Sequence, residues 1–314
     1  MSQRIRVFAP ASASNLGPGF DVLGLALERP GDVVEVERRE AAGVEIVEVT
    51  GANSLSTDPT ENVVGVAATA VLRRLPSATT GGGVRLWLQK QMPLASGLGS
   101  SAASSVAGAV AVNTLFGAPL SQRALIDCAL EGEAAAAGTV HADNVAPSLL
   151  GGIVLIRSYE PLEVVPLPVP SDLRIVVVHP HAEVATAEAR RLVAERRYTI
   201  AQVVSNLGNI AALVSALHSG DLALFGRCIQ DALVEPLRAP LVPGFDEVKQ
   251  AALAAGALGC SISGSGPSVF AFADADSTAA AVVDAMQARF RRVGVDSNAY
   301  TGPVNVRGAR VVSA

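Results

Sequence analysis

The sequence predicts an α+β fold divided into two domains, and three observations support this prediction. The chain has 314 residues, which is about the length of two ordinary domains. Segments with strand-like alternation and segments with helical periodicity follow one another along the chain, as in two-layer folds. Four prolines between residues 159 and 172 interrupt this series. Because proline disfavours helix interiors and central strands, we place a linker there and the domains at 1–158 and 159–314.

The composition indicates a folded chain with a core of small side chains. Hydrophobic residues make up 50% of the sequence, charged residues 17% and aromatic residues 4%, a balance that excludes intrinsic disorder. The formal net charge is −5 and no basic tract occurs, which argues against a nucleic-acid or anionic-membrane surface. Any phosphate site should therefore be local and built from the backbone.

The sequence predicts neither a disulfide framework nor a membrane span. The three cysteines, Cys128, Cys228 and Cys260, are too few and too scattered for a disulfide framework or a zinc cluster. The N-terminus has no long apolar region of the kind found in signal peptides. The uncharged stretch 91–122 contains Pro93 and several glycines and serines, so we expect a loop followed by a buried helix. The protein is expected to be soluble and cytoplasmic.

In the first half, apolar and polar residues alternate in the predicted strands and recur at helical spacing in the predicted helices. Arg73 and Arg74 suit the C-terminal end of the first helix, and Ser121 is the predicted N-cap of the third. The predicted strands are 4–8, 33–37, 44–49, 84–88 and 153–157, and the predicted helices are 62–75, 100–116 and 121–136.

The second half repeats this alternation, with an interruption at 235–244 that contains three prolines. One or two further strands are expected near the C-terminus. The predicted strands are 173–178, 259–263 and 269–273, and the predicted helices are 186–195, 200–218, 221–232, 246–255 and 277–290.

The segment PLASGLGSSAA (93–103) is the strongest candidate for a binding site. Gly97 and Gly99 allow positive φ angles and close approach of the backbone to an anion. Ser100 and Ser101 begin a long uncharged helix, whose N-terminus offers free N–H groups and the positive end of the helix dipole. The spacing matches neither a Walker A loop nor a dinucleotide fingerprint. A plain connector before a buried helix is the alternative interpretation.

The segment PASASNLGPGFDVLG (10–24) follows the first strand and is rich in turn-forming residues. Asn15 and Asp21 are its polar anchors. An amide and a carboxylate this close together could hold the ammonium and carboxylate groups of an amino acid. A local Asx-turn with its own backbone hydrogen bonds is the alternative.

Polar residues also gather between residues 133 and 144. Glu133 is a lone carboxylate on an alanine-rich helix; it could face the phosphate loop and hold Mg²⁺, or it could be solvated. His141, Asp143 and Asn144 crowd a turn. His141 is a candidate general base, with a structural role as the alternative.

Two arginine positions stand in unusual contexts. Arg190, or its neighbour Arg191, lies in TAEARR, and Arg238 lies in EPLRAPLVPG. The guanidinium group matches carboxylate and phosphate geometry through two parallel hydrogen bonds. Surface salt bridges are the alternative for both positions.

These segments together resemble the GHMP kinase superfamily. PASASNLGPGFD, PLASGLGSSA and SISGSGPS occur in the order of its three signature motifs. PASASNLGPGFDVLGLAL, HADNVAP, and EPLR with the PG that follows it resemble the homoserine kinase family more narrowly, and the resemblance covers nearly the whole chain. It implies an N-terminal domain like a ribosomal-protein fold, a C-terminal ferredoxin-like domain and an active site between them.

The resemblance also implies an activity: ATP-dependent phosphorylation of the side-chain hydroxyl of L-homoserine to O-phospho-L-homoserine, in threonine biosynthesis. ATP and Mg²⁺ are the implied cofactors, and a homodimer is the implied assembly. The implied metal ligands are Ser101 and Glu133, and Asn62 matches a position near the adenine. The implied nucleotide-binding residues are Asn62, Pro93, Leu94, Ala95, Ser96, Gly97, Leu98, Gly99, Ser100 and Ser101. The implied homoserine-binding residues are Asn15, Asp21, Asn144, Thr186, Arg190 and Arg238, and the implied catalytic residues are Asn144, Arg238 and Glu133.

Two other functions remain open at this point. One is a GHMP kinase for another small alcohol, such as mevalonate or shikimate, against which HADNVAP and EPLR argue. The other is a non-catalytic nucleotide-binding module, against which Ser101 and Glu133 argue because a pure binder needs no placed metal ligand. We find no clear equivalent of a catalytic aspartate base, so we expect transfer without a strong general base.

Overall fold

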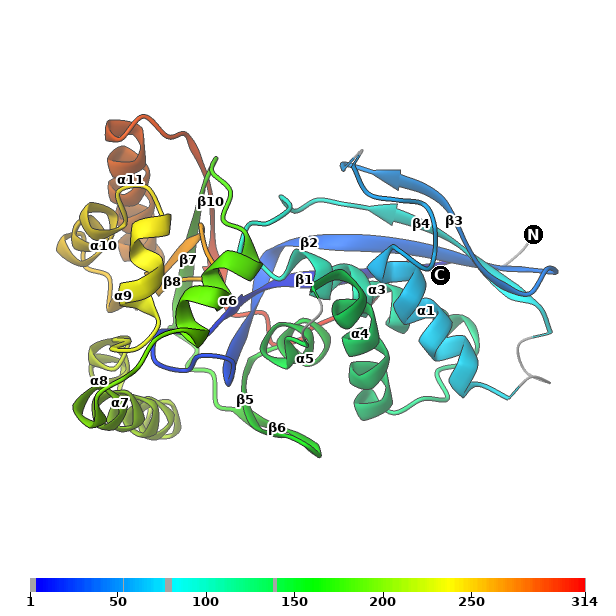
Figure 1. Cartoon of the computed structure of the whole chain (residues 1–314), viewed down its shortest axis with the longest axis horizontal. Helices are drawn as coiled ribbons and strands as arrows, with labels where there is room; N and C mark the ends of the chain where they lie inside the picture. Colours follow the sequence, from blue (N-terminus) through cyan, green and yellow to red (C-terminus); the bar gives the residue numbers. More distant parts are fainter. Residues whose placement is uncertain (1–3, 53, 77–80, 138–139, 314) are drawn as a thin grey trace.

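The computed structural model describes residues 4–52, 54–76, 81–137 and 140–313, which form two sheets with helices packed on them (Figure 1). The first sheet has the strand order β11-β1-β2-β4-β3, and β5 pairs with both β2 and β6. Helices α1, α3, α4 and α5 lie together on one face of it (Figure 1). The strands are β1 (Arg4–Ser14), β2 (Leu23–Arg39), β3 (Gly43–Thr50), β4 (Gly83–Gln89), β5 (Ile153–Tyr159), β6 (Leu162–Leu167) and β11 (Arg310–Ser313). The helices are α1 (Val63–Arg74), α3 (Ser100–Leu115), α4 (Gln122–Ala137) and α5 (Ala142–Leu150).

The side-chain pattern of β2 explains why only one face of this sheet carries helices. Val34 and Val36 are fully buried beneath the helices. Glu35 and Glu37 alternate with them on the other face, where both carboxylates pair with Arg4 of β1. Period-two alternation thus separates an apolar face from a charged one.

The second sheet has the order β10-β7-β9-β8, which is the strand order of a ferredoxin-like βαββαβ unit. Alternate residues of β7 serve two cores: Ile175 and Val177 join the large cluster shared with the first half, and Val176 and Val178 face α10 and α11. The strands are β7 (Arg174–Pro180), β8 (Gly259–Ile262), β9 (Val269–Ala273) and β10 (Ser297–Pro303). The helices are α6 (Thr186–Ala194), α7 (Ile200–Ser219), α8 (Leu222–Arg227), α9 (Glu235–Arg238), α10 (Phe245–Ala254) and α11 (Asp276–Arg292), with a 3₁₀ turn at Ala239–Leu241.

The predicted helix ends are confirmed where a cap residue marks them. The side chain of Asn62 accepts a hydrogen bond from the backbone N–H of Val64 and caps α1. Ser121 accepts from the N–H of Ala124 at the start of α4, as predicted. The stretch 91–122 forms a loop and the buried helix α3. Among the described helices, the one that could cross a membrane by length and composition is instead α7.

Several sequence predictions were wrong, each for a tertiary reason. The turn-rich segment 10–24 contributes to two strands, because β1 runs on to Ser14 and β2 starts at Leu23. The expected turn after His141 is the helix α5, and the helix predicted over 221–232 ends at Arg227. Tertiary pairing and burial override local turn and helix preferences at these places.

The predicted linker at 159–172 is partly a strand. Within it, β6 pairs with β5 as an edge strand, a position that tolerates the prolines. The C-terminal strand β11 also returns to the first sheet and pairs with β1. A division of the chain between residues 158 and 159 therefore stays a prediction. Both β6 and β11 lie after this point in the sequence and still belong to the first sheet.

Candidate active site

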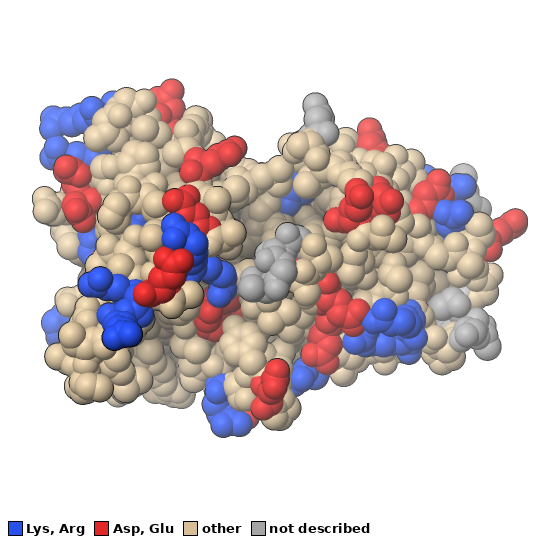
Figure 2. All heavy atoms as spheres, viewed as in Figure 1, with Lys and Arg blue, Asp and Glu red and all other residues tan. Residues whose placement is uncertain are grey.

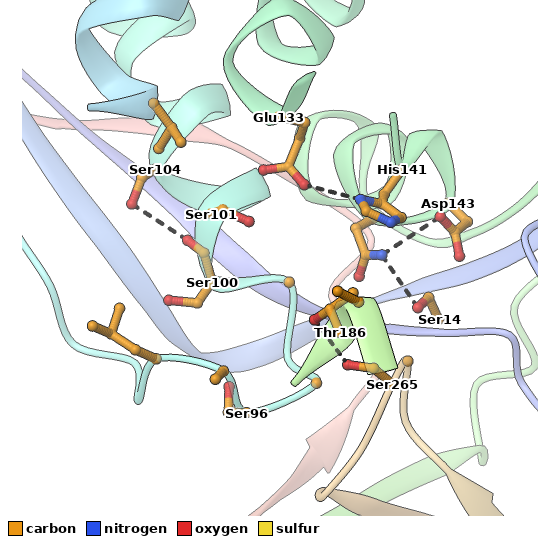
Figure 3. Close-up of a pocket in the computed structure, with 18 of the residues that line it drawn as sticks. Ser14, Ser96, Ser100, Ser101, Ser104, Glu133, His141, Asp143, Thr186 and Ser265 are labelled. Carbon is orange, nitrogen blue, oxygen red and sulfur yellow. Dashed lines mark hydrogen bonds and ion pairs between the residues drawn. The ribbon is translucent and has the colours of Figure 1, made fainter. Parts of the chain in front are cut away.

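A cavity of about 490 Å³ lies between the two halves of the molecule, where the surface is hollowed in the space-filling view (Figure 2). Segments from both halves meet there, among them the loop before α3, the end of α4, the start of α5, the first turn of α6 and the glycine turn after β8 (Figure 3). The turn after β1, the segment before α1 and α9 also contribute lining residues. Most of the predicted site residues line this cavity. They are Asn15, Asp21, Asn62, Leu94, Ala95, Ser96, Gly97, Gly99, Ser100, Ser101, Glu133, Asn144, Thr186, Arg190 and Arg238.

Pro93 and Leu98 do not line the cavity. Leu98 is fully buried in the core, because its side chain anchors the loop from behind while its carbonyl accepts from the N–H of Ser12. Its predicted place in the site is therefore limited to the backbone of the loop. The motif does not show which of its residues face the cavity and which, like Leu98, anchor the loop in the core.

The N-terminus of α3 opens directly onto the cavity. Its N-cap, Gly99, has a left-handed φ of 63° and no side chain to accept from the first-turn N–H groups. A β-carbon at Gly99 would lie 2.1 Å from Ser12 Oγ and 2.9 Å from Asn144 Oδ1, so no larger residue fits. No charged residue occurs in α3. The arrangement is suited to an anion bound by backbone N–H groups.

The loop before α3 is held in place by the glycine turn after β8. The hydroxyl of Ser263 donates to the carbonyl of Gly97 at 2.7 Å, and the N–H of Ser268 donates to the carbonyl of Ser96 at 3.3 Å. Gly97 has a φ of 75°, and a β-carbon there would lie 2.4 Å from the carbonyl oxygen of Ser263. Two motifs far apart in sequence therefore form one binding loop and its support.

Glu133 supplies a buried acidic group beside this loop. It is 3% exposed; its Oε2 lies 3.5 Å from His141 Nδ1, and its Oε1 has no hydrogen-bond partner. Its carboxylate points toward Ser101 (Figure 3). One carboxylate and one hydroxyl beside a phosphate site fit Mg²⁺, which keeps few protein ligands and binds phosphate oxygens. No cluster of three or more His, Cys, Asp and Glu side chains suited to a metal occurs among the described residues, so an all-protein cage does not form in that part.

His141 lies between two charged groups. Arg190 Nε donates to His141 Nε2 at 3.2 Å, so this ring nitrogen accepts and the ring proton belongs on Nδ1, facing Glu133. Both nitrogens are thereby engaged. A histidine held in this way orients its neighbours, which favours the structural interpretation over a general base.

Arg190 faces the cavity, whereas Arg191 is exposed and pairs with Glu195. The guanidinium of Arg190 donates to both carboxylate oxygens of Asp21. Arg238 is 3% exposed, donates to the carbonyl of Gly264 at 2.7 Å, and leaves its Nε without a partner. Burial lowers the pKa of Arg238 to about 10, with the charge of Arg190 acting in the same direction, so it remains cationic at neutral pH. A partly unsatisfied buried cation is suited to a carboxylate ligand.

Three amide and hydroxyl side chains complete this end of the cavity. Asn15 donates to the carbonyl of Gly264 at 3.0 Å and accepts from the N–H of Asp21 at 3.1 Å. Asn144 accepts from the hydroxyl of Ser12 at 2.8 Å and donates to that of Ser14 at 3.2 Å. Thr186 begins α6, and its hydroxyl lies 3.3 Å from that of Ser265 (Figure 3).

Asn62 lines the cavity, but its amide group is already engaged. Besides capping α1, it donates to the carbonyl of Ser56 at 2.7 Å. Its direct contact is therefore with a segment that also lines the cavity. Contact with an adenine base stays a prediction.

Among the lining residues that sequence reasoning did not assign to the site, two are charged and buried. Asp143 is 1% exposed; burial raises the pKa of its carboxyl to about 6, and the charge of Asp21 acts in the same direction. The other is Lys90, whose ammonium group lies behind the first turn of α3. Helical spacing in 142–150 could have indicated that Asp143 lies on a buried helix. For Lys90, the sequence offers no signal beyond the scarcity of lysine.

The chain is similar in sequence to known kinases over its whole length. It matches the family "GHMP kinases N terminal domain" over residues 62–152 and "GHMP kinases C terminal" over residues 213–292. A homoserine kinase of Chloroherpeton thalassium is 42% identical, with 99% of this chain and 100% of that protein covered. One of Arabidopsis thaliana is 44% identical, with 99% of this chain and 85% of that protein covered.

Solved structures agree with the sequence comparison. A crystal structure of homoserine kinase from Cytophaga hutchinsonii has a TM-score of 0.95 and 46% identity, covering 99% of this chain and 98% of that chain. A mevalonate kinase of L. major in complex with R-mevalonate has a TM-score of 0.73 at 17% identity, covering 98% of this chain and 99% of that chain. At that identity, the second similarity concerns the fold alone.

Proposed function

This chain belongs to the homoserine kinase family of the GHMP kinases, and from that premise we propose how its cavity divides between ATP and L-homoserine. The protein transfers the γ-phosphoryl group of ATP to the side-chain hydroxyl of L-homoserine, a step in threonine biosynthesis. One observation carries the division: a single cavity is lined both by an uncapped helix N-terminus and by two arginines. The first suits a triphosphate and the second an amino-acid carboxylate.

At the nucleotide end, loop 94–101 holds the phosphates against the first turn of α3. Phosphoryl transfer passes through a loose transition state, so most of the catalysis comes from positioning and charge neutralisation. The backbone N–H groups supply fixed donors in a site enclosed by the two halves. The residues that would hold Mg²⁺ are Ser101 and Glu133, since the second oxygen of Glu133 has no protein partner. When bound there, Mg²⁺ supplies the charge neutralisation of the β- and γ-phosphates.

At the homoserine end, the substrate's carboxylate binds the guanidinium groups of Arg238 and Arg190. Its ammonium group then lies by the carboxylates of Asp21 and Asp143. These two carboxylates repel one another, and a second cation beside Arg190 would offset that repulsion. Both ends of the amino acid are thus matched by opposite charge, which discriminates against alcohols without these groups.

The amide of Asn144 orients the reacting hydroxyl, since it lines the cavity directly beside Gly99, the N-cap of α3. His141 does not take the proton, because its Nε2 already accepts from Arg190. The hydroxyl proton stays on the substrate oxygen until late in the reaction and then passes to an oxygen of the transferred phosphoryl group.

A coupled assay of ADP release tests this division of the cavity. Turnover is measured with L-homoserine, mevalonate, 4-hydroxybutyrate or no acceptor. We expect rapid turnover with homoserine alone. Comparable kcat/KM with 4-hydroxybutyrate, which lacks the α-amino group, would refute the charge-matched amino-acid site. Nucleotide binding without turnover on any acceptor would favour a binding module.

For the assembly, we propose a homodimer in the cytoplasm formed through α7. Its outer side chains recur at the 4-3-4 spacing of a heptad: Ile200, Val204 and Leu207 are 79%, 61% and 61% exposed, and Ala211 continues the series. No charged residue occurs in α7, whereas arginines at 196 and 197 precede it and Asp221 follows it. Two antiparallel copies would bury the apolar stripe and bring the basic end of each helix toward the negative end of the other.

A further inference from the structure

Lys90 is buried directly behind the predicted phosphate loop. It is one of two lysines in the chain, it follows directly after β4, and its side chain is 1% exposed. Its ammonium group donates to the carbonyl of Ser100 at 2.9 Å, to the hydroxyl of Ser100 at 2.7 Å and to that of Ser104 at 3.0 Å. It also pairs with the fully buried carboxylate of Asp32 on β2. Four groups, three from α3 and one from β2, therefore converge on one cation.

Asp32 fixes this cation at the end of β4. Its Oδ1 accepts from the N–H of Gln91 at 3.0 Å, and its Oδ2 accepts from the hydroxyl of Ser104 at 2.6 Å. The side chain of Asp32 is 0% exposed. A buried pair of this kind is well satisfied, and removing one partner would leave an uncompensated charge.

The hydrogen-bond directions bear on the cavity. An ammonium group can only donate, so the hydroxyl of Ser100 must accept from Lys90. Its own proton therefore points away from Lys90, and Ser100 lines the cavity at the first turn of α3 (Figure 3). By contrast, the hydroxyl of Ser104 donates its proton to the carboxylate of Asp32.

We propose that Lys90, with its charge offset by Asp32, is a positioning residue for the nucleotide: it fixes the first turn of α3 and makes the Ser100 hydroxyl a donor to the phosphates. This inference rests on the nucleotide end of the cavity proposed above. Without Lys90, the Ser100 hydroxyl is free to turn and donate to Asp32 or to a backbone carbonyl. The phosphates then lose a donor, although the lysine itself need not touch them.

A purely structural ion pair is the competing explanation, and variants of the pair separate the two. Kd for a fluorescent ADP analogue and Tm are measured without homoserine. K90M should weaken ADP binding about tenfold and lower Tm, because it unpairs Asp32. D32N/K90M removes both charges, so it should recover most of the Tm but not the affinity. K249M removes the other lysine, which pairs with Glu235, and should leave the affinity unchanged.

Coupling with Ser100 gives the sharper readout. S100A should weaken ADP binding several-fold in the wild type. It should have little further effect in D32N/K90M, because the Ser100 hydroxyl no longer donates to the phosphates in that background. Equal effects of S100A in both backgrounds, or wild-type affinity in D32N/K90M, would overturn the positioning role while leaving the nucleotide site intact. Failure of the wild-type protein to bind ADP would instead overturn the nucleotide site, and this inference with it.

Discussion

Arg190 donates hydrogen bonds to both carboxylate oxygens of Asp21, at 3.2 and 3.0 Å. Two residues expected to hold opposite ends of the substrate thus neutralise each other across the cavity. Homoserine carries one charge of each sign, so it can exchange this ion pair for two new ones without leaving a charge unpaired. Both side chains are partly exposed, at 27% for Arg190 and 31% for Asp21, so a substrate can reach the pair.

Asp21→Asn should raise KM for homoserine about tenfold and leave KM for ATP within about twofold. The change removes one partner of the ammonium group and also frees Arg190, whereas the α3 N-terminus is untouched. Steady-state kinetics with each substrate varied in turn measures both constants. A rise in KM for ATP of the same size would contradict the assignment of Asp21 to the homoserine end.

The pH dependence of kcat/KM for homoserine should reflect the protonation of Asp143. Its carboxyl has a pKa of about 6, so it gains a proton and loses its charge as the pH falls through that value. A neutral carboxyl no longer attracts the ammonium group, and kcat/KM for homoserine should therefore fall on acidification below about pH 6. Asp143→Asn should have a low kcat/KM without this decline. Parallel profiles for the two proteins would show that another group is responsible.

Glu133→Gln should abolish Mg²⁺-dependent turnover, whereas His141→Ala should retain substantial kcat. Glutamine keeps the size of the side chain but removes the charge available to a cation beside Ser101. His141 has both ring nitrogens engaged and is not needed as a base. Turnover is measured over a range of Mg²⁺ concentrations, with circular dichroism to check folding. Equal loss in two folded variants would disprove transfer without a general base.

Gly97→Ala should reduce both stability and ATP affinity. The position combines a φ of 75° with a β-carbon contact of 2.4 Å, while Gly117 has a φ of 87° and nothing within 4 Å. Gly117→Ala is therefore the matched control for backbone strain alone, which costs about 1 kcal/mol. Urea unfolding and KM for ATP should show the larger loss in Gly97→Ala, with KM for ATP unchanged in Gly117→Ala. Similar effects in both would mean that Ser263 gives way.

Leu207→Glu should convert the protein from a dimer to a monomer of 32.0 kDa. A charge in the middle of the α7 stripe would face its own copy across a two-fold axis. Val293→Glu is the control, since Val293 is 45% exposed and lies after α11. Light scattering after gel filtration gives the mass. A monomeric wild-type protein would rule out the dimer, and a dimeric Leu207→Glu would place the interface elsewhere.

Local sequence signals predicted the elements that depend on local physics. Apolar residues at helical spacing that end in Arg73 and Arg74 predicted α1, and an uncharged run that must be buried predicted α3. Residues 10–14 were not predicted as strand because their small and turn-forming side chains look like a loop. Only pairing with β2, and burial beneath α3 and α5, makes them extended.

The candidate site divides in the same way. Its motifs predicted a phosphate loop, Glu133 and two arginines, which the structure brings to one cavity, because glycine spacing and charge in an apolar context are local features. The pairing of Arg190 with Asp21 could not be predicted, since it joins residues from the two halves of the chain. The inward direction of the Leu98 side chain was equally unpredictable, because residues of one motif can point in opposite directions.

By itself, the sequence determined the family and the chemistry and predicted which loop takes the phosphates, because these follow from short runs of residue types. The tertiary structure alone decided which charges meet: Lys90 with Asp32, Arg190 with Asp21, and Asp143 in a buried place. Electrostatic interactions depend on distance and burial rather than on separation along the chain, so only the packing of the two halves could assign these partners.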